Sequence, residues 1–207
     1  MFDPFNRARV LETYGSGVCV HKDDKYLYIL TNAHVVDQFK VVNTEFFRNG
    51  RKTKKAPAYV VFRVKNSRVG IDVAILALPL STFANNESLP EIIPIAPISY
   101  IPPVGTKLAG AGCPGGTWSQ SWVGRVLESG SNTIDYNPFP IGGQSGSGIF
   151  GKIKTPDGKI VDAVFGLVTW QDTENKIGRG VSVIGINNAL ENRVQESSFV
   201  APGYVTV

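Results

Sequence analysis

Cysteine and long hydrophobic runs are both scarce in this 207-residue chain, and each shortage argues against a class of protein. The two cysteines, Cys19 and Cys113, lie far apart and lack the short spacing of a metal site. A secreted protein of this size would more often carry several disulfides, so we expect reduced thiols, with a single disulfide as the alternative. No stretch approaches membrane-spanning length, and residues 1–15 lack the apolar segment of a signal peptide. We therefore expect a cytoplasmic protein without a membrane partner, unless a signal has been removed.

Net charge is also small. Lysine and arginine number 21 against 17 acidic residues, and a formal charge of +4 does not by itself indicate a nucleic-acid partner. Five cationic side chains fall within residues 48–55 (RNGRKTKK), around an Asn-Gly pair typical of a hairpin turn. We expect this segment to be the solvated tip of a long hairpin between strands at 39–43 and 58–64. Binding of an acidic substrate, RNA or an anionic surface is the alternative.

Helical periodicity is found in one place only, around residues 186–195, where Asn187 is a candidate N-cap. The rest is rich in glycine (22) and proline (13) and shows short β-branched and aromatic runs punctuated by turn residues. This pattern predicts an all-β barrel or sandwich. The expected strands are 17–20, 26–31, 39–43, 58–64, 71–78, 106–111, 121–128, 148–153, 160–169 and 180–186.

A proline-rich stretch without regular periodicity, residues 79–103, indicates a connection between two halves. We expect an N-terminal unit over residues 1–85, a linker over 86–104 and a C-terminal unit over 105–207.

The stretch GGQSGSG, residues 142–148, places two serines among glycines. It is either a flexible loop before a strand or a tight turn that presents a serine, with backbone N–H groups left free for an oxyanion. A nucleophilic serine needs a base, and the chain has only two histidines. His21 lies in the charged turn HKDDK and is expected at the surface. His34 follows an apolar strand in ILTNAHVV; it is a candidate base, with a hydrogen-bonded core histidine as the alternative.

Asp72, in GIDVAILAL, is the one acid inside a long apolar run. Burying its carboxylate there costs several kcal/mol unless it is hydrogen-bonded or paired. A carboxylate that orients a catalytic histidine meets that requirement. The alternative is that Asp72 merely opens the strand at its exposed end.

The blocks TNAHVV, DVAIL and GQSGSG, in this order, resemble those of trypsin-like, chymotrypsin-fold serine proteases, especially HtrA-like bacterial and viral members. Residues 15–20, 105–116 and 166–170 resemble supporting strands, so the likeness covers roughly residues 15–190, and no PDZ-like module follows it. The resemblance implies two six-stranded antiparallel Greek-key barrels with a short C-terminal helix. It also implies a serine endopeptidase acting on proteins or peptides.

Site roles follow from that resemblance. Ser145 is implied as the nucleophile, His34 as its base and Asp72 as the group that orients His34, while the backbone N–H groups of Gly143 and Ser145 form the oxyanion hole. Ser147 is the competing nucleophile, but the family pattern places the nucleophile first. The alternative function is a catalytically silent binding module for peptide or nucleic acid. An α/β-hydrolase esterase is disfavoured because its triad runs Ser, acid, His.

Two positions depart from the family pattern and bear on how the enzyme is activated and where it acts. Gln144 stands where zymogen-type relatives carry an aspartate that pairs with a new N-terminal amine, so activation by N-terminal trimming is not expected. The site is then either preformed or ordered by substrate or an activating partner. Val35 follows His34 in place of the cysteine of secreted relatives. Both favour an intracellular or virus-encoded enzyme, in the latter case in the host cytoplasm.

The resemblance gives only a coarse indication of which residue precedes the cleaved bond. Phe139 stands where Arg/Lys-cleaving relatives have an aspartate, and Val168 where glutamate- and glutamine-cleaving relatives often have a histidine. We therefore expect an uncharged, small or apolar residue before the cut. No residue cluster implies a metal or organic cofactor. The expected substrate-binding residues are Phe139, Thr169, Trp170, Gln171 and Gly180.

Overall fold

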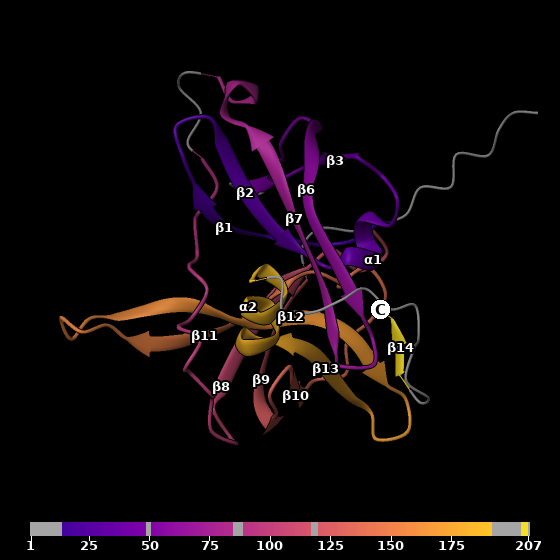
Figure 1. The fold of residues 1–207 in the computed structure, drawn as a ribbon, viewed down its shortest axis with the longest axis vertical. Coiled ribbons are helices and arrows are strands. Elements are labelled where there is room, and N and C mark those ends of the chain that lie inside the picture. The colour runs from indigo at the N-terminus through magenta and orange to yellow at the C-terminus, as the bar shows by residue number, and fades with distance from the viewer. Residues whose placement is uncertain (1–13, 49–50, 85–88, 117–119, 192–203, 207) are drawn as a thin grey trace, which may run out of the picture.

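The computed structural model describes residues 14–48, 51–84, 89–116, 120–191 and 204–206. Its regular structure is almost entirely antiparallel β, arranged as an N-terminal half and a C-terminal half, which are the upper and lower parts of Figure 1. The predicted all-β class is confirmed.

The N-terminal half is a five-stranded sheet of order β1-β2-β7-β6-β3. Its strands are β1 (Val18–Lys22), β2 (Tyr26–Thr31), β3 (Val41–Thr44), β6 (Ala56–Asn66) and β7 (Ile71–Pro79). A one-turn helix, α1 (Ala33–Val36), follows β2, and a short 3-10 helix (Leu80–Thr82) follows β7. A separate two-stranded hairpin is formed by β4 (Phe47–Arg48) and β5 (Arg51–Lys52). In the described residues this half therefore has five strands in one sheet plus a hairpin, where six in one barrel were expected.

The C-terminal half is a closed six-stranded barrel, because β11 pairs with both β8 and β12. Its strands are β8 (Lys107–Gly112), β9 (Gln120–Ser129), β10 (Thr133–Asn137), β11 (Gly148–Lys154), β12 (Ile160–Asp172) and β13 (Ile177–Ser182). A 3-10 turn (Pro114–Gly116) follows β8, helix α2 (Val183–Leu190) follows β13, and a further strand, β14 (Tyr204–Thr206), pairs with β12.

Burial along the strands follows the sequence pattern. β8 reads KLAGAG with alternate residues buried, as expected for a strand with one face against the core. β7 reads IDVAILALP and is buried almost throughout, because it lies in the middle of its sheet and packs on both faces.

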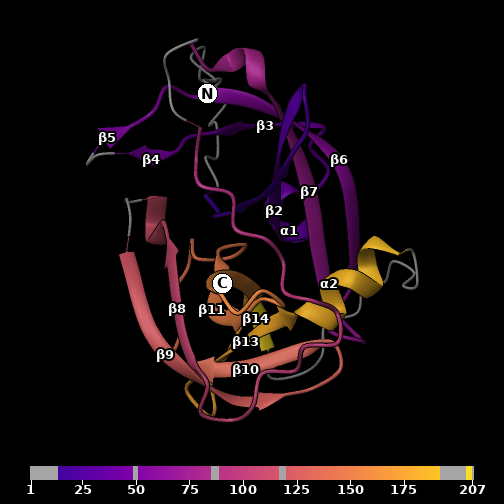
Figure 2. The ribbon, with the colours of Figure 1, turned by 90° about the vertical axis from the view of Figure 1, so that its left-hand side faces the viewer.

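One hydrophobic cluster joins the two halves. Its N-terminal members come from β1, β2, β6 and β7, and its C-terminal members from β12, β13 and α2. Helix α2 contacts β7 on one side and β12 and β13 on the other, and Figure 2 shows it beside the boundary between the halves. A common core therefore holds elements of the two halves against each other. The residue ranges proposed for two domains and a linker remain a prediction.

Three local features differ from the sequence prediction or go beyond it. Strand β10 was not predicted, because its sequence TIDYN has an acid at its centre. Residues 183–186, expected in a strand, open α2, whose N-cap is Ser182 and not Asn187: the Ser182 hydroxyl accepts from the Gly185 N–H at 3.2 Å. The part of the expected helix beyond residue 191 lies outside the described residues.

Cys19 and Cys113 are buried, and no disulfide joins them. No helix among the described residues is long and apolar enough to cross a membrane.

Candidate active site

His34 and Asp72 are brought together by the register of β2 and β7. Thr31 lies opposite Ala74, so the turn of α1 that begins at the end of β2 stands over the start of β7. The Asp72 carboxylate is fully buried, and both of its oxygens accept hydrogen bonds from His34. Oδ1 accepts from the His34 backbone N–H at 3.0 Å, and Oδ2 is 2.8 Å from Nδ1 of the ring. The desolvation of a buried carboxylate is offset here by two bonds to one residue.

Asn32 links this pair to the other half of the molecule. Its side-chain amide donates to the Asp72 carbonyl at 2.7 Å and to the Thr169 hydroxyl at 3.1 Å. Thr169 lies on β12, so the start of β7 and the C-terminal part of β12 are tied through one buried amide.

Ser145 lies on the loop between β10 and β11, here called the nucleophile loop (residues 138–147). Its Oγ is 2.8 Å from Nε2 of His34, the ring nitrogen opposite the one that faces Asp72. The three side chains named from the sequence therefore form a continuous chain of hydrogen bonds. Ser145 is 1% exposed, and the His34 side chain 15%.

Some backbone N–H groups around Ser145 are bonded and others are free. The N–H of Gln144 donates to the Ile141 carbonyl, that of Gly146 to Val168, and that of Ser147 to Gln144. In the described part of the chain, the N–H groups of Gly143 and Ser145 donate to nothing. These are the two groups that the sequence resemblance named as an oxyanion hole.

Ser16 holds this loop from the opposite side and was missed at the sequence level. Its N–H donates to the Ser145 carbonyl at 2.7 Å, and its hydroxyl donates to the Gly143 carbonyl at 2.9 Å. The same hydroxyl accepts from the Cys113 N–H at 3.0 Å. Because Ser16 binds both carbonyls, it fixes the orientation of the two peptide units next to the free N–H groups. No local sequence signal reveals this role, since it depends on contacts across 97 or more positions.

Two glycines of the loop are required by its geometry. Gly143 has φ +92°, and a Cβ there would lie 2.5 Å from the Cys113 carbonyl oxygen. Gly146 has φ +82°, and a Cβ there would lie 2.2 Å from the Thr31 hydroxyl oxygen. Side chains are strongly disfavoured at both positions. The tight turn, and not a flexible loop, accounts for the glycines around Ser145.

Ser147 lies behind the loop. It is completely buried, and its hydroxyl has no hydrogen-bond partner within the described residues. Its carbonyl accepts from the Val168 N–H at 3.0 Å. His34 therefore faces Ser145 and not Ser147.

Of the expected substrate-binding residues, Thr169, Trp170 and Gln171 lie together on β12, and Gly180 lies on the neighbouring strand β13. Thr169 is buried beneath Asn32, and Trp170 is 4% exposed in the core that joins the halves. The Gln171 side chain donates to the Pro140 carbonyl at 2.5 Å. Gly180 is buried opposite Val168 in β13. Their assignment to substrate binding stays a prediction.

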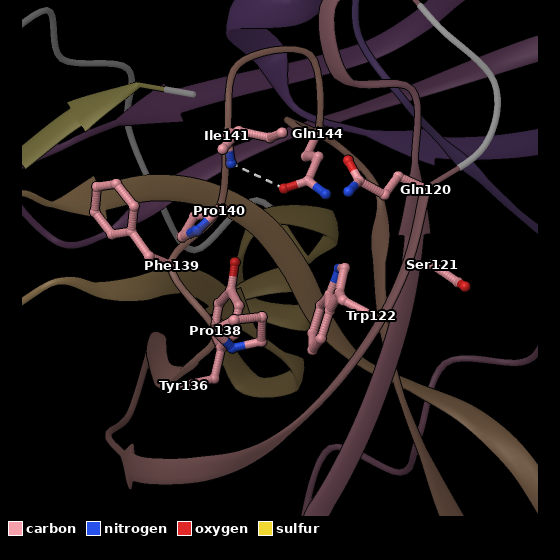
Figure 3. Close-up of a pocket in the computed structure, with 9 residues that line it drawn as sticks. All are labelled: Gln120, Ser121, Trp122, Tyr136, Pro138, Phe139, Pro140, Ile141 and Gln144. Atoms are coloured by element: carbon pink, nitrogen blue, oxygen red, sulfur yellow. Dashed lines mark hydrogen bonds between the residues drawn. The ribbon is translucent and has the colours of Figure 1, made fainter.

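Phe139 lines a pocket of about 230 Å³ beneath the nucleophile loop, together with Trp122, Tyr136 and Gln144. Gln120 and Gln144 both turn their side chains into its upper end, and the Gln144 side-chain oxygen accepts from the Ile141 N–H at 2.9 Å (Figure 3). A neutral Gln144 thus braces the loop internally, where zymogen-type relatives are expected to use an ion pair. Burial raises the pKa of the Tyr136 hydroxyl far above its ordinary value.

His21 lies away from this site. It is exposed at the end of β1 and stacks on Tyr28, with ring centroids 5.7 Å apart. Among the described residues, no group of three His, Cys, Asp or Glu side chains could hold a metal ion.

Comparison with known proteins gives the class. The family model of the trypsin-like peptidase domain matches residues 15–161, which is more than half of the chain. The chain therefore belongs to the trypsin-like peptidase family. It is a serine endopeptidase, and its substrates are peptides or proteins. No curated protein matches the chain.

Solved structures agree on the fold. A serine endoprotease from Yersinia pestis is 26% identical with a TM-score of 0.59, over 91% of this chain and 58% of that one. The active form of the Rv3671c protease from M. tuberculosis is 19% identical with a TM-score of 0.60, over 91% of this chain and 78% of that one. Its inactive form is 20% identical, also with a TM-score of 0.60, over 86% and 83% of the two chains.

Proposed function

We propose that this serine endopeptidase cleaves peptide bonds through a Ser145–His34–Asp72 triad and an acyl-enzyme intermediate. The observation that carries the proposal is the position of the His34 ring, 2.8 Å from Ser145 Oγ through one nitrogen and 2.8 Å from Asp72 Oδ2 through the other. An imidazole held in this way can take a proton only at Nε2, because Nδ1–H is bonded to the carboxylate.

Acylation follows from these contacts. Ser145 Oγ bonds to the scissile carbonyl carbon while its proton passes to His34 Nε2. The buried Asp72 carboxylate stabilises the imidazolium that results, and it does so at short range from a position shielded from solvent. When the tetrahedral intermediate collapses, the C–N bond breaks and His34 returns the proton to the leaving amine.

The free N–H groups of Gly143 and Ser145 bind the oxyanion of that intermediate. They are already oriented by the bonds that Ser16 makes to the neighbouring carbonyls, so little reorganisation accompanies the reaction. Loss of one such donor typically costs about 10²–10³ in rate.

Deacylation uses the same groups in reverse. His34 Nε2 takes a proton from water, whose oxygen bonds to the acyl carbon. The ester C–O bond then breaks and Ser145 Oγ regains a proton from His34, which restores the enzyme.

For specificity, we propose an uncharged, small or apolar residue before the cut. The support is the absence of an acidic side chain at Phe139 and of a histidine at Val168.

The test is labelling with a fluorophosphonate probe followed by peptide mapping, with Ser145→Ala and Ser147→Ala compared with the wild type. We expect the probe on the peptide that carries Ser145, and loss of labelling in Ser145→Ala alone. Ser147→Ala is a matched control, because it removes a buried hydroxyl that has no partner in the described structure. Absence of labelling in folded wild-type protein would contradict the proposal and favour a binding module.

A further inference from the structure

The edge of β12 beyond Thr169 carries a strand from the chain's own C-terminal segment. β14 pairs with it in antiparallel fashion, with Trp170 opposite Thr206, Gln171 opposite Val205 and Asp172 opposite Tyr204. The barrel is closed by the pairing of β11 with the first part of β12, so β14 is an additional strand outside that closure. Figure 1 shows β14, in yellow, at the side of the lower half.

That edge leads directly to the nucleophile loop. The Val168 carbonyl accepts from the Gly146 N–H at 2.9 Å, and the Val168 N–H donates to the Ser147 carbonyl at 3.0 Å. Trp170 lies two residues further along the strand, a rise of about 7 Å. The nucleophile loop and β14 therefore occupy consecutive stretches of one strand edge.

β14 runs along the β12 edge in the direction that a substrate would take there. Its residues run from a position opposite Asp172 to one opposite Trp170, so the segment advances toward Val168 in its own N-to-C direction. A peptide added to a sheet edge gains affinity from its main-chain hydrogen bonds and specificity from the alternate side chains that it presents. A substrate whose carbonyl reached Ser145 from this side would use the same edge in the same direction.

One further contact links the paired edge to the site. Gln171, opposite Val205, donates its side-chain amide to the Pro140 carbonyl, so the paired part of β12 is joined to the nucleophile loop.

We propose that residues 204–206 are a built-in peptide ligand of the β12 edge, which must leave that edge before an extended substrate can bind there. The ligand class of the site is an extended peptide that adds as an antiparallel strand at Trp170–Asp172. This inference rests on the proposed function of Ser145. Because the ligand is tethered, its effective concentration is about millimolar, and a weak pairing suffices to compete with dilute substrate.

The first experiment compares the full chain with a chain that ends at Gly203, using fluorescein-labelled casein and a fluorophosphonate probe in parallel. We expect casein hydrolysis to be faster by about fivefold or more without residues 204–207, as the loss of a millimolar intramolecular competitor predicts. We expect both forms to be labelled at Ser145, because the small probe does not need the β12 edge. Equal casein rates, at any level including none, would overturn the inference. Failure to label either form would instead overturn the proposed function.

A second experiment keeps the full length and so does not depend on the truncated chain being stable. In an antiparallel ladder, alternate residues direct their N–H toward the partner, and proline removes that donor. Tyr204→Pro and Val205→Pro should therefore differ, and the one that loses a ladder bond should hydrolyse casein faster than wild type. Thermal melts identify any variant that has lost the fold. If both folded variants match wild type, the pairing does not regulate access and the inference is wrong.

A synthetic acetylated peptide of sequence GYVTV, added to the shortened chain, should restore inhibition by raising KM with little change in kcat. The reversed peptide VTVYG has the same composition and is the control. Equal effects of the two peptides would contradict recognition of this segment.

Discussion

In the N-terminal half, His34 lies in the helical turn α1 just after β2 and Asp72 lies near the start of the neighbouring strand β7, whereas in the C-terminal half Ser145 lies on a loop between strands. The first pair is positioned by a regular ladder, so its geometry follows from the register of β2 and β7. The nucleophile is positioned by backbone bonds from separate segments, among them Ser16 and Val168. The acid–base pair therefore depends on a sheet, and the nucleophile depends on contacts between the halves.

The largest loss of activity is expected from breaking the contact between Asp72 and His34 in the N-terminal half. In Asp72→Asn the remaining oxygen would stay with the His34 backbone N–H, so the amide NH₂ would face Nδ1. The ring proton would then sit on Nε2, which could no longer accept from Ser145, and kcat should fall by about 10⁴. Steady-state kinetics and a thermal melt check this. Asp162→Asn, at an exposed position on β12, is the control. A loss below tenfold in folded protein would contradict the assigned role.

The next largest loss of activity is expected from distorting the nucleophile loop. Gly143→Ala introduces a Cβ 2.5 Å from the Cys113 carbonyl oxygen at φ +92°, so the loop must shift and misplace its free N–H. We expect kcat/KM to fall by about 10²–10³, the typical cost of one oxyanion donor. Gly142→Ala is the matched control, because a Cβ there meets nothing within 4 Å. Similar losses in the two variants would show that the loop tolerates no change at all, and would refute the specific role of Gly143.

A smaller effect is expected at the contact between the halves. Ser16→Ala removes the hydroxyl that donates to the Gly143 carbonyl, a bond worth about 1 kcal/mol, so kcat should fall by roughly five- to tenfold. KM should change little, because Ser16 positions the loop and does not touch substrate. Ser131→Ala, an exposed serine between β9 and β10, is the comparison. An unchanged kcat would mean that the loop holds its shape without Ser16.

The smallest effect is expected far from the site. The Tyr28 hydroxyl and the Lys25 and Tyr26 N–H groups bind Asp23 and lower the pKa of its carboxyl to about 2. A folded-state pKa below the ordinary value stabilises the protein above pH 4, and that stability is lost as the pH falls toward 2.

Asp23→Asn should therefore lower the Tm at pH 7 by about one or two degrees, and the difference should shrink between pH 4 and 2. Activity at neutral pH should not change. Asp24→Asn is the matched control, because Asp24 accepts none of these three bonds. A difference in Tm that persists unchanged at pH 2 would contradict the assignment to this carboxyl.

Most strands could be predicted because their apolar, β-branched runs are continuous and end at turn residues. β10 could not be predicted, since a central acid argues against a buried strand. Asp135 is buried there only because Arg179 of β13 binds both of its oxygens, at 2.5 Å each. The true start of α2 was missed for a similar reason, because β13 ends where Ser182 is held against the Ser131 and Asn132 carbonyls.

The sequence by itself determined the all-β class, and its resemblance to a known family named His34, Asp72 and Ser145, because three motif blocks in a fixed order leave few alternatives. Only the tertiary structure decided how the nucleophile loop is held, through Ser16 and Val168, and which strand edge β14 occupies. Apart from the Ser16 hydroxyl, these features rest on backbone groups that every residue carries. Which N–H meets which carbonyl depends on how distant segments pack, and no side-chain pattern records it.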